Sequence, residues 1–230
     1  MTDATPESQT PATPAMAMLV TLGTIALISG LLVVLVVEAT ASRIAENQRI
    51  ATEKAVFRVL PGAERQRGIV VQDGKLQLLD PTQAEVAELY AAYEAGGKLR
   101  GVAIPAAAPG YAGLIHALYG YDPACKCIVG FKVLKSIETP GLGDKIDFDE
   151  DFLRNFEALD ARLDETGGGL ANAIRTVKHG SKIQAWEIDA ISGSTVSSKS
   201  VGRMLNQSAG RYVPLVEAQL DLLEGAGDGS

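Results

Sequence analysis

Basic residues are scarce at the start of this chain, and no Lys or Arg precedes Arg43. The chain as a whole has 21 basic and 28 acidic residues and a formal net charge of −7. A protein that binds a nucleic acid backbone presents a basic patch to the phosphates. This composition therefore argues against nucleic acid as a partner.

Residues for metal and hydrolytic chemistry are also few, with two Cys and two His in the sequence. Cys125 and Cys127 need further ligands to bind a metal, and neither His116 nor His179 has a suitable spacing from them. His116 falls inside a predicted strand and is interpreted as structural. The sequence also lacks a Gly-x-Gly-x-x-Gly string, a Walker loop and a recognisable Ser-His-Asp arrangement. We predict neither a catalytic residue nor a metal site.

Two local patterns have an unremarkable first interpretation. Cys125 and Cys127 are interpreted as two small residues at the start of a strand, with a disulfide as the alternative, because a bridge between such close positions would be strained. An acidic run could bind Ca²⁺ or Na⁺, but it lacks the spacing of a calcium loop and is interpreted as solvated. The run comprises Asp144, Asp147, Asp149, Glu150 and Asp151.

The run Met16–Val37 contains no charged residue. A helix of about 20 apolar residues spans the hydrocarbon core of a bilayer. A cleaved signal peptide is the alternative, and Ala39-Thr40-Ala41 could serve as its cleavage site, but such a peptide has a basic n-region and a shorter apolar stretch. We predict a retained single-pass transmembrane helix, with the lipid bilayer as a partner.

The remaining pattern predicts an α+β domain, with a mixed or antiparallel sheet flanked by helices. The expected organisation is a disordered tail at 1–15, the transmembrane helix at 16–37, a helical stalk at 38–60, the domain at 61–224 and a tail at 225–230. A hairpin is predicted over 68–79, turning at Asp73-Gly74. Further strands are predicted at 99–104, 111–119, 126–135 and 182–188, and helices at 81–95, at 152–159 and after Pro214.

The stretch 189–198 carries the strongest functional signal. It reads Asp-Ala-Ile-Ser-Gly-Ser-Thr-Val-Ser-Ser and stands between a strand-like and a helix-like run. The first N–H groups of a helix have no partner within the helix, and they favour a phosphate ahead of them. Five hydroxyls surround this place, on Ser192, Ser194, Thr195, Ser197 and Ser198. An ordinary serine-rich helix cap is the alternative.

A second stretch, 138–146, reads Glu-Thr-Pro-Gly-Leu-Gly-Asp-Lys-Ile. Pro140 fixes its own backbone angle, whereas Gly141 and Gly143 allow positive φ and close approach of the backbone. A rigid loop of this kind is suited to lying against a flat ring. The alternative is a surface turn, the usual meaning of a Pro-Gly string.

Together, the two strings resemble the signatures of the FMN-binding subunits of the Rnf and Na⁺-translocating NADH:quinone oxidoreductase complexes. The first matches the family's flavinylation motif at Asp189, Ser192, Gly193, Thr195 and Ser197, with Ser194 in place of the usual Ala. The second resembles the family's other signature, and its Asp-Lys-Ile ending is closer to the Rnf G protein. The resemblance covers roughly residues 100 to 206.

The resemblance implies that Thr195 carries FMN covalently through a phosphoester bond. The adjoining residues of the cofactor site are then Ser192, Gly193, Ser194, Val196, Ser197 and Ser198. The loop comprising Glu138, Thr139, Pro140, Gly141, Leu142 and Gly143, together with Lys145, is expected to pack against the flavin. Whether Glu138 bonds to the ring or to a loop amide is left open.

The resemblance also implies an electron-relay subunit, not catalytic alone, in an inner-membrane ferredoxin:NAD oxidoreductase that moves Na⁺ or H⁺. Its expected partners are the other Rnf subunits and a flavin transferase. The alternatives are the Nqr C protein of the Na⁺-translocating NADH:quinone oxidoreductase and a non-redox binding or assembly module. The family places the domain in the periplasm, whereas Arg43, Arg49 and Lys54 after the apolar run favour the cytoplasm.

Overall fold

The computed structural model describes residues 15–79 and 87–227. The chain forms two compact units, Met1–Arg49 and Ile50–Ser230. The predicted tail at 1–15 and the final tail residues 228–230 thus lie largely outside the described residues, as does the first part of the helix predicted at 81–95.

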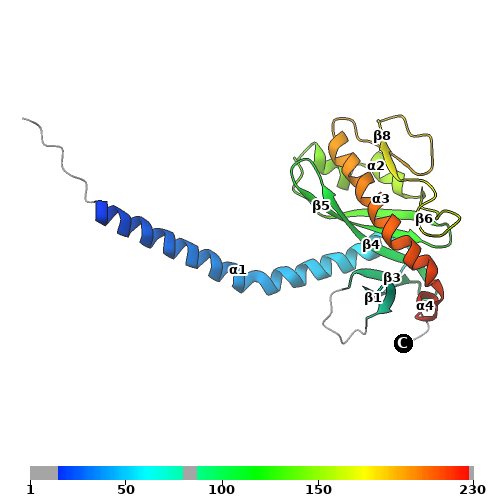
Figure 1. Ribbon diagram of the computed structural model, residues 1–230, viewed down its shortest axis with the longest axis horizontal. Helices are drawn as coiled ribbons and strands as arrows, with labels where there is room; N and C mark the ends of the chain where they lie inside the picture. The colour runs from blue at the N-terminus through cyan, green and yellow to red at the C-terminus, as the bar shows by residue number, and fades with distance from the viewer. Residues whose placement is uncertain (1–14, 80–86, 228–230) are drawn as a thin grey trace, which may run out of the picture. The chain divides into compact units, whose positions relative to one another are not determined.

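Helix α1, Ala15–Val59, includes the whole apolar run and continues without a break through the expected stalk (Figure 1). In the described part of the chain it is the single helix long and apolar enough to cross a membrane, and its apolar side chains are exposed. The hydroxyls of Thr21 and Thr24 donate to carbonyls four residues earlier, each at 2.7 Å. These bonds satisfy polar groups that would otherwise be costly to place in lipid.

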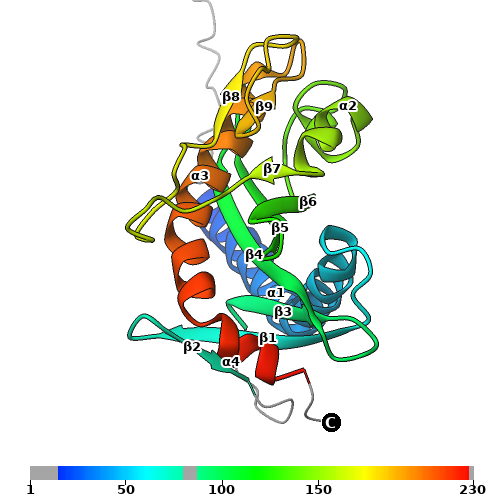
Figure 2. The ribbon, with the colours of Figure 1, turned by 90° about the vertical axis from the view of Figure 1, so that its right-hand side faces the viewer.

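The second unit is built on a seven-stranded sheet in which every pairing is antiparallel (Figure 2). This confirms the predicted α+β class. The strand order is β2-β1-β3-β4-β5-β6-β7. The strands are β1 Arg65–Gln72, β2 Lys75–Leu78, β3 Leu89–Tyr93, β4 Leu99–Pro109, β5 Leu114–Asp122, β6 Cys127–Lys135 and β7 Leu159–Asp160. The β1–β2 hairpin turns at Asp73 and Gly74, both with positive φ, as the Asp-Gly pair predicts.

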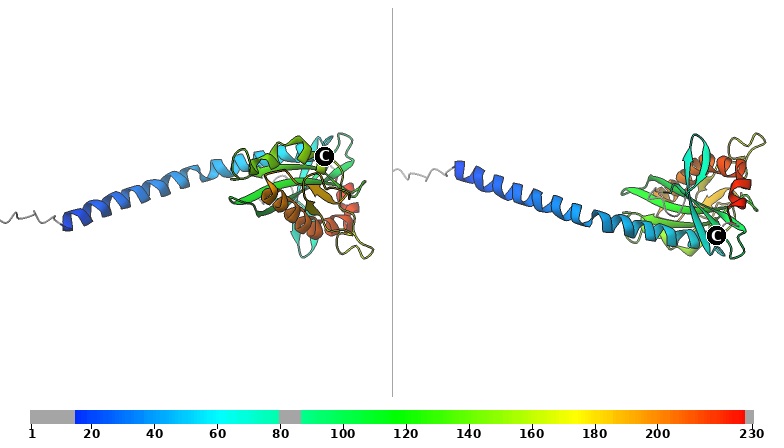
Figure 3. Two further views of the ribbon diagram at one scale, coloured as in Figure 1. Left: turned by 90° about the horizontal axis from the view of Figure 1, so that it is seen from above. Right: turned by 90° about the horizontal axis from the view of Figure 1, so that it is seen from below.

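One face of the sheet is covered by α3, Thr195–Ala218 (Figures 2 and 3). Its buried apolar residues recur at helical spacing and pack against inward side chains of the strands, including Val102, Ile104 and Tyr119. They are Val201, Met204, Leu205, Ala209, Val213 and Val216. This apolar stripe fixes the rotation of α3 about its axis and therefore decides which residues at its start remain exposed.

The other face of the sheet packs against the last residues of α1. Ala55, Val56 and Val59 are buried there with Leu60, against Ala92, Ala103 and Leu118 of the sheet. Gly120 and Gly130 are paired across β5 and β6, and a Cβ at either would collide with the Val59 carbonyl oxygen. The two glycines therefore make the space in which the chain enters the domain.

Short elements complete the domain around the start of α3. The 3₁₀ helix η1 spans Gly143–Asp147, α2 spans Glu150–Leu153 and η2 spans Arg154–Phe156. A separate parallel pair contains β8, Arg175–Val177, and β9, Glu187–Asp189. The last helix is α4, Leu220–Gly225.

Several predicted elements are wrong or misplaced. Leu89–Tyr93 is a strand and not part of a helix; both faces of this strand are buried, so it lacks the alternation that reveals a strand. The helix predicted at 152–159 ends at Phe156. The strand predicted at 182–188 begins only at Glu187, and the last helix begins well before Pro214, at Thr195.

Cys125 and Cys127 form a disulfide, so the preferred interpretation of the two cysteines was wrong. Lys126 between them has a φ of 53°, and this left-handed conformation brings the flanking Cα atoms to 5.2 Å. That separation is within the ordinary range for disulfides. The bridge closes the turn between β5 and β6.

The Gly120–Gly130 pair yields a stability prediction. Gly130→Ala should lower the free energy of unfolding by about 1–3 kcal/mol, because the added methyl overpacks against the Val59 backbone. Urea unfolding of the detergent-solubilised chain, followed by the fluorescence of Trp186, would measure the change. Gly96→Ala is the matched control, since a Cβ there has nothing within 4 Å. Equal stability of the two variants would show that the α1 end does not depend on this close approach.

Candidate functional site

The two strings singled out in the sequence meet in the structure at the start of α3. The Ser194 hydroxyl donates to the Leu142 carbonyl at 2.9 Å, although the two residues lie 52 positions apart. The Ser197 hydroxyl donates to the carboxylate of Glu138. Thr139, Pro140, Gly141 and Leu142 form an exposed turn beside these contacts.

Glu138 is the centre of this arrangement, with 5% of its surface exposed. Its Oε1 accepts hydrogen bonds from the amides of Tyr111 and Ala112, each at 2.9 Å, while Oε2 accepts from Ser197. Of the two roles left open for Glu138, the structure thus shows the bond to backbone amides, and these belong to the β4–β5 hairpin. Burial raises the pKa of its carboxyl, but the hydrogen bonds from Ser197 and from the amides of 111–113 lower it below its usual value overall.

Two glycines give the Glu138 side chain its space. A Cβ at Gly110 or at Gly143 would collide with the Glu138 carboxylate, and at Gly143 also with the Ser197 hydroxyl. Gly143 therefore permits a close approach, as predicted, but towards protein groups. Gly141 has a φ of 78° and open space around it, so there the left-handed backbone itself favours glycine.

The five hydroxyls around the helix start fall into two groups. Those of Ser194, Ser197 and Ser198 are buried and bonded within the protein; Ser198 donates to the Ser194 carbonyl at 2.9 Å and accepts from the Ile191 amide at 3.1 Å. Those of Ser192 and Thr195 are exposed and have no hydrogen bond to any residue that the structure describes. No side chain caps α3, because the hydroxyl of the cap residue Ser194 is used elsewhere. The serine-rich stretch is therefore not an ordinary side-chain cap.

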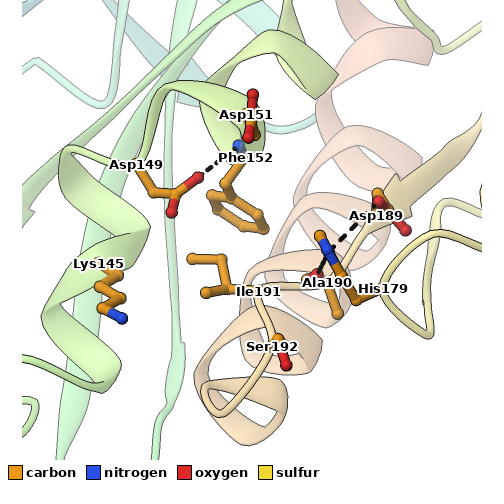
Figure 4. A pocket seen from close by; sticks show the side chains of 9 residues that line it. All are labelled: Lys145, Asp149, Asp151, Phe152, His179, Asp189, Ala190, Ile191 and Ser192. Carbon is orange, nitrogen blue, oxygen red and sulfur yellow. Dashed lines mark hydrogen bonds and ion pairs between the residues drawn. The ribbon is translucent and has the colours of Figure 1, made fainter.

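Asp189, the first residue of the motif, holds a neighbouring loop. Its carboxylate accepts from the amides of Gly180 at 3.0 Å and Ser181 at 3.3 Å, and it lies 3.6 Å from His179 Nδ1. Figure 4 shows His179 against Asp189 and the Ala190 carbonyl, with Ser192 close by. A cavity of about 220 Å³ lies here, lined by Lys145, Asp149, Asp151, Phe152, His179, Asp189, Ala190, Ile191 and Ser192. Lys145 and Ser192 from the predicted site thus face one hollow.

Some residues that build the site had no signal in the sequence. The amides of the β4–β5 hairpin tip are one case, because any residue type offers a backbone N–H. Asn155 is another: it is buried, its Oδ1 accepts from the Asp189 amide at 2.9 Å, and its Nδ2 donates to the Phe152 carbonyl at 2.9 Å. It ties the short helices to the strand that precedes the motif.

The acidic run is used in local contacts. Asp147 pairs with Lys132 at 2.6 Å, Asp149 accepts from the Phe152 amide at 3.0 Å, and Asp151 pairs with Arg154. Within residues 15–79 and 87–227, no three His, Cys, Asp or Glu side chains gather in a way that could hold a metal ion. His116 is exposed on β5.

Comparison with known proteins places this geometry in a family. Residues 110–209, which include the hairpin tip, the loop and the start of α3, match the model of the FMN-binding domain. The G protein of the ion-translocating oxidoreductase complex of Pseudomonas aeruginosa is 32% identical over 195 residues, covering 81% of this chain and 83% of that protein. The G protein of the Na⁺-translocating ferredoxin:NAD⁺ oxidoreductase complex of Acetobacterium woodii is 35% identical over 105 residues, covering 45% of this chain and 44% of that protein.

A solved structure shares the fold. It is the C protein of the Na⁺-translocating NADH-quinone reductase of Parabacteroides distasonis, with a TM-score of 0.58 and 21% identity, covering 76% of this chain and 96% of that one. At this identity the likeness concerns the fold alone. The extended match to the Pseudomonas protein, together with the FMN-binding domain, shows that the chain belongs to the Rnf G family of ion-translocating oxidoreductase complexes.

Proposed function

We propose that this chain is an electron-relay subunit of a membrane ion-translocating ferredoxin:NAD oxidoreductase and carries FMN covalently through a phosphoester at Thr195. The observation that carries the attachment is the exposed Thr195 hydroxyl, free of protein partners among the described residues, at the first position of α3. Its neighbours Ser194 and Ser197 are buried and bonded, which disfavours them as acceptors.

The residues present fit such a cofactor. The first amides of α3 lack a side-chain cap and favour a phosphate. Exposed apolar side chains lie on the surrounding segments, with Tyr111 at 75%, Leu142 at 52% and Val196 at 50% of their surface. Leu142 and its turn are suited to pack against the isoalloxazine or the ribityl chain, whereas the Glu138 carboxylate is already occupied by protein donors.

A bound FMN supplies the redox chemistry, and the chain supplies attachment, position and electrostatics. Covalent attachment would prevent loss of the cofactor, and α1 would keep it close to membrane partners. The chain has relatives that are subunits of a complex, so its partners are other subunits of such a complex. We further propose a flavin transferase for maturation and the lipid bilayer around α1.

The side of the membrane is part of the proposal. The Cys125–Cys127 disulfide supports the periplasm, since disulfides form and persist in oxidising compartments. The basic residues after the apolar run count for the cytoplasm, but long domains cross membranes largely regardless of such charges. We therefore propose a single-pass protein of the inner membrane with its domain in the periplasm.

The attachment is tested by Thr195→Val, expressed together with the flavin transferase and Mg²⁺. We expect complete loss of the fluorescent band on a denaturing gel, because Val keeps the shape of Thr and removes the nucleophilic hydroxyl. Ser192→Ala, which removes the other exposed hydroxyl of the motif, should retain the band. A band that persists in Thr195→Val would move the attachment to another residue, and its absence from the unaltered chain would favour the non-redox alternative.

The topology is tested with a thiol reagent that cannot cross membranes. Ser230→Cys, in a background with Cys125 and Cys127 replaced by Ser, should be labelled in spheroplasts before lysis. Thr2→Cys in the same background is the control for the opposite side and should be labelled only after lysis. The reverse pattern would place the domain in the cytoplasm.

The role of Glu138 predicts a pH-dependent stability. Because hydrogen bonds lower its pKa in the folded state, the ionised carboxylate stabilises the fold at neutral pH, and this contribution is lost as pH falls below about 4.3, the usual pKa of glutamate. Glu138→Gln should therefore cost about 1–3 kcal/mol at pH 7. The difference from the unaltered chain should shrink in acid.

Urea unfolding at pH 7 and at pH 4 would measure this effect, with the exposed Glu157→Gln as the matched control. Flavin loading of Glu138→Gln should also fall, because the turn and the start of α3 are no longer held together. A cost that is equal at both pH values, or full loading, would contradict a structural role for the charged carboxylate.

A further inference from the structure

A second hollow lies beside Thr195, on the side of α3 that faces β8. This α3–β8 groove has a volume of about 360 Å³ and is lined by Ile174, Arg175, Thr176, Val196, Lys199, Gly202 and Arg203. None of its cationic residues belongs to the two family strings. The groove therefore adds a feature that the motifs do not describe.

The groove is held open by specific packing. The Thr176 hydroxyl donates to the Ser198 carbonyl at 2.9 Å, which fixes β8 on the helix. A Cβ at Gly202 would collide with the same Thr176 hydroxyl, so the close approach requires glycine. The position of the cationic side chains along α3 is thus set by the fold.

The three cations of the groove differ in how far they are already neutralised. Arg175 pairs with Glu187 at 2.7 Å, and the amides of Ile183 and Gln184 together with Arg175 lower the pKa of Glu187 to about 2. Arg203 donates to the Pro109 carbonyl at 3.2 Å and to the Ser200 hydroxyl at 2.8 Å, both uncharged acceptors. Lys199 is exposed and has neither a hydrogen bond nor an ion pair with any described residue.

The spacing of Lys199 from the proposed attachment residue is informative. Residues four apart on a helix lie on the same face, so Lys199 stands one turn along α3 from Thr195. Neither side chain belongs to the buried stripe of α3. The long flexible stem of a lysine can bring its ammonium back to a group attached at Thr195, and an ammonium is a suitable donor to phosphate oxygens.

We propose that Lys199, at the end of the α3–β8 groove nearest Thr195, binds the phosphodiester through which FMN joins the chain. The inference rests on the proposed attachment and adds a cofactor-binding residue outside both motifs. Arg203, further along the groove, adds positive charge without a direct contact. A phosphodiester keeps one negative charge after the bond has formed, and Lys199 supplies the matching positive charge in a chain that is acidic overall.

The contact is tested by the reactivity of the lysine amines. Acetylation by an activated ester, followed by mass spectrometry, is measured on the FMN-loaded chain and on Thr195→Val, which carries no FMN. The reagent attacks the neutral amine, and an ammonium bonded to phosphate keeps its proton. We expect Lys199 to react about tenfold more slowly in the loaded chain. Lys98, exposed in the β3–β4 turn, should react equally in both.

Variants give a second readout that does not depend on electron transfer. At limiting flavin transferase, Lys199→Gln should load FMN about tenfold more slowly than the unaltered chain. Lys199→Arg, which keeps the charge, should load at a similar rate, as should the control Lys98→Gln.

The outcomes separate this inference from the proposed function. Absence of FMN from Thr195 in the unaltered chain would overturn both. Attached FMN with unchanged Lys199 reactivity, or normal loading of Lys199→Gln, would overturn the phosphodiester contact alone. Protection of Lys199 only in the assembled complex would also overturn it, and would assign the groove to an acidic segment of another protein of the complex.

Discussion

The buried carboxylate of Glu138 is the interaction on which the rest of the site depends. It joins three segments that are remote in sequence: the β4–β5 hairpin tip, the loop that begins at Glu138 itself, and the start of α3. A buried charge is tolerated only when it is well hydrogen-bonded, and here two amides and a hydroxyl meet that need. Glycine at positions 110 and 143 is a consequence of the same interaction, because any side chain there would displace the carboxylate.

This arrangement divides the hydroxyls of the motif by function. The fold uses the hydroxyls of Ser194, Ser197 and Ser198 to fix the helix start against its surroundings. It leaves Thr195 facing solvent at the first helical position, beside amides that no side chain caps. A rigid frame with one free hydroxyl is a suitable acceptor for a modifying enzyme, because the reactive group needs no rearrangement of the frame.

The sheet connects this site to the membrane helix through packing on both of its faces. The apolar stripe of α3 covers one face, and the last residues of α1 cover the other, next to the paired glycines at 120 and 130. Because the final turns of α1 are part of the domain core, the chain enters the domain through a packed element. The helix that anchors the protein therefore also contributes to the stability of the flavin domain.

The sequence by itself determined the α+β class, the apolar helix, the β1–β2 turn and the two strings of the site, because each depends on local chemistry: periodicity, an Asp-Gly pair, or a contiguous motif. Only the tertiary structure decided which hydroxyls are free, that Glu138 holds backbone amides, and that Asn155 and Lys199 adjoin the site. It also turned Leu89–Tyr93 into a strand and joined Cys125 to Cys127. These features arise from contacts between segments distant in the chain or from backbone angles, and neither leaves a mark on the residue types nearby.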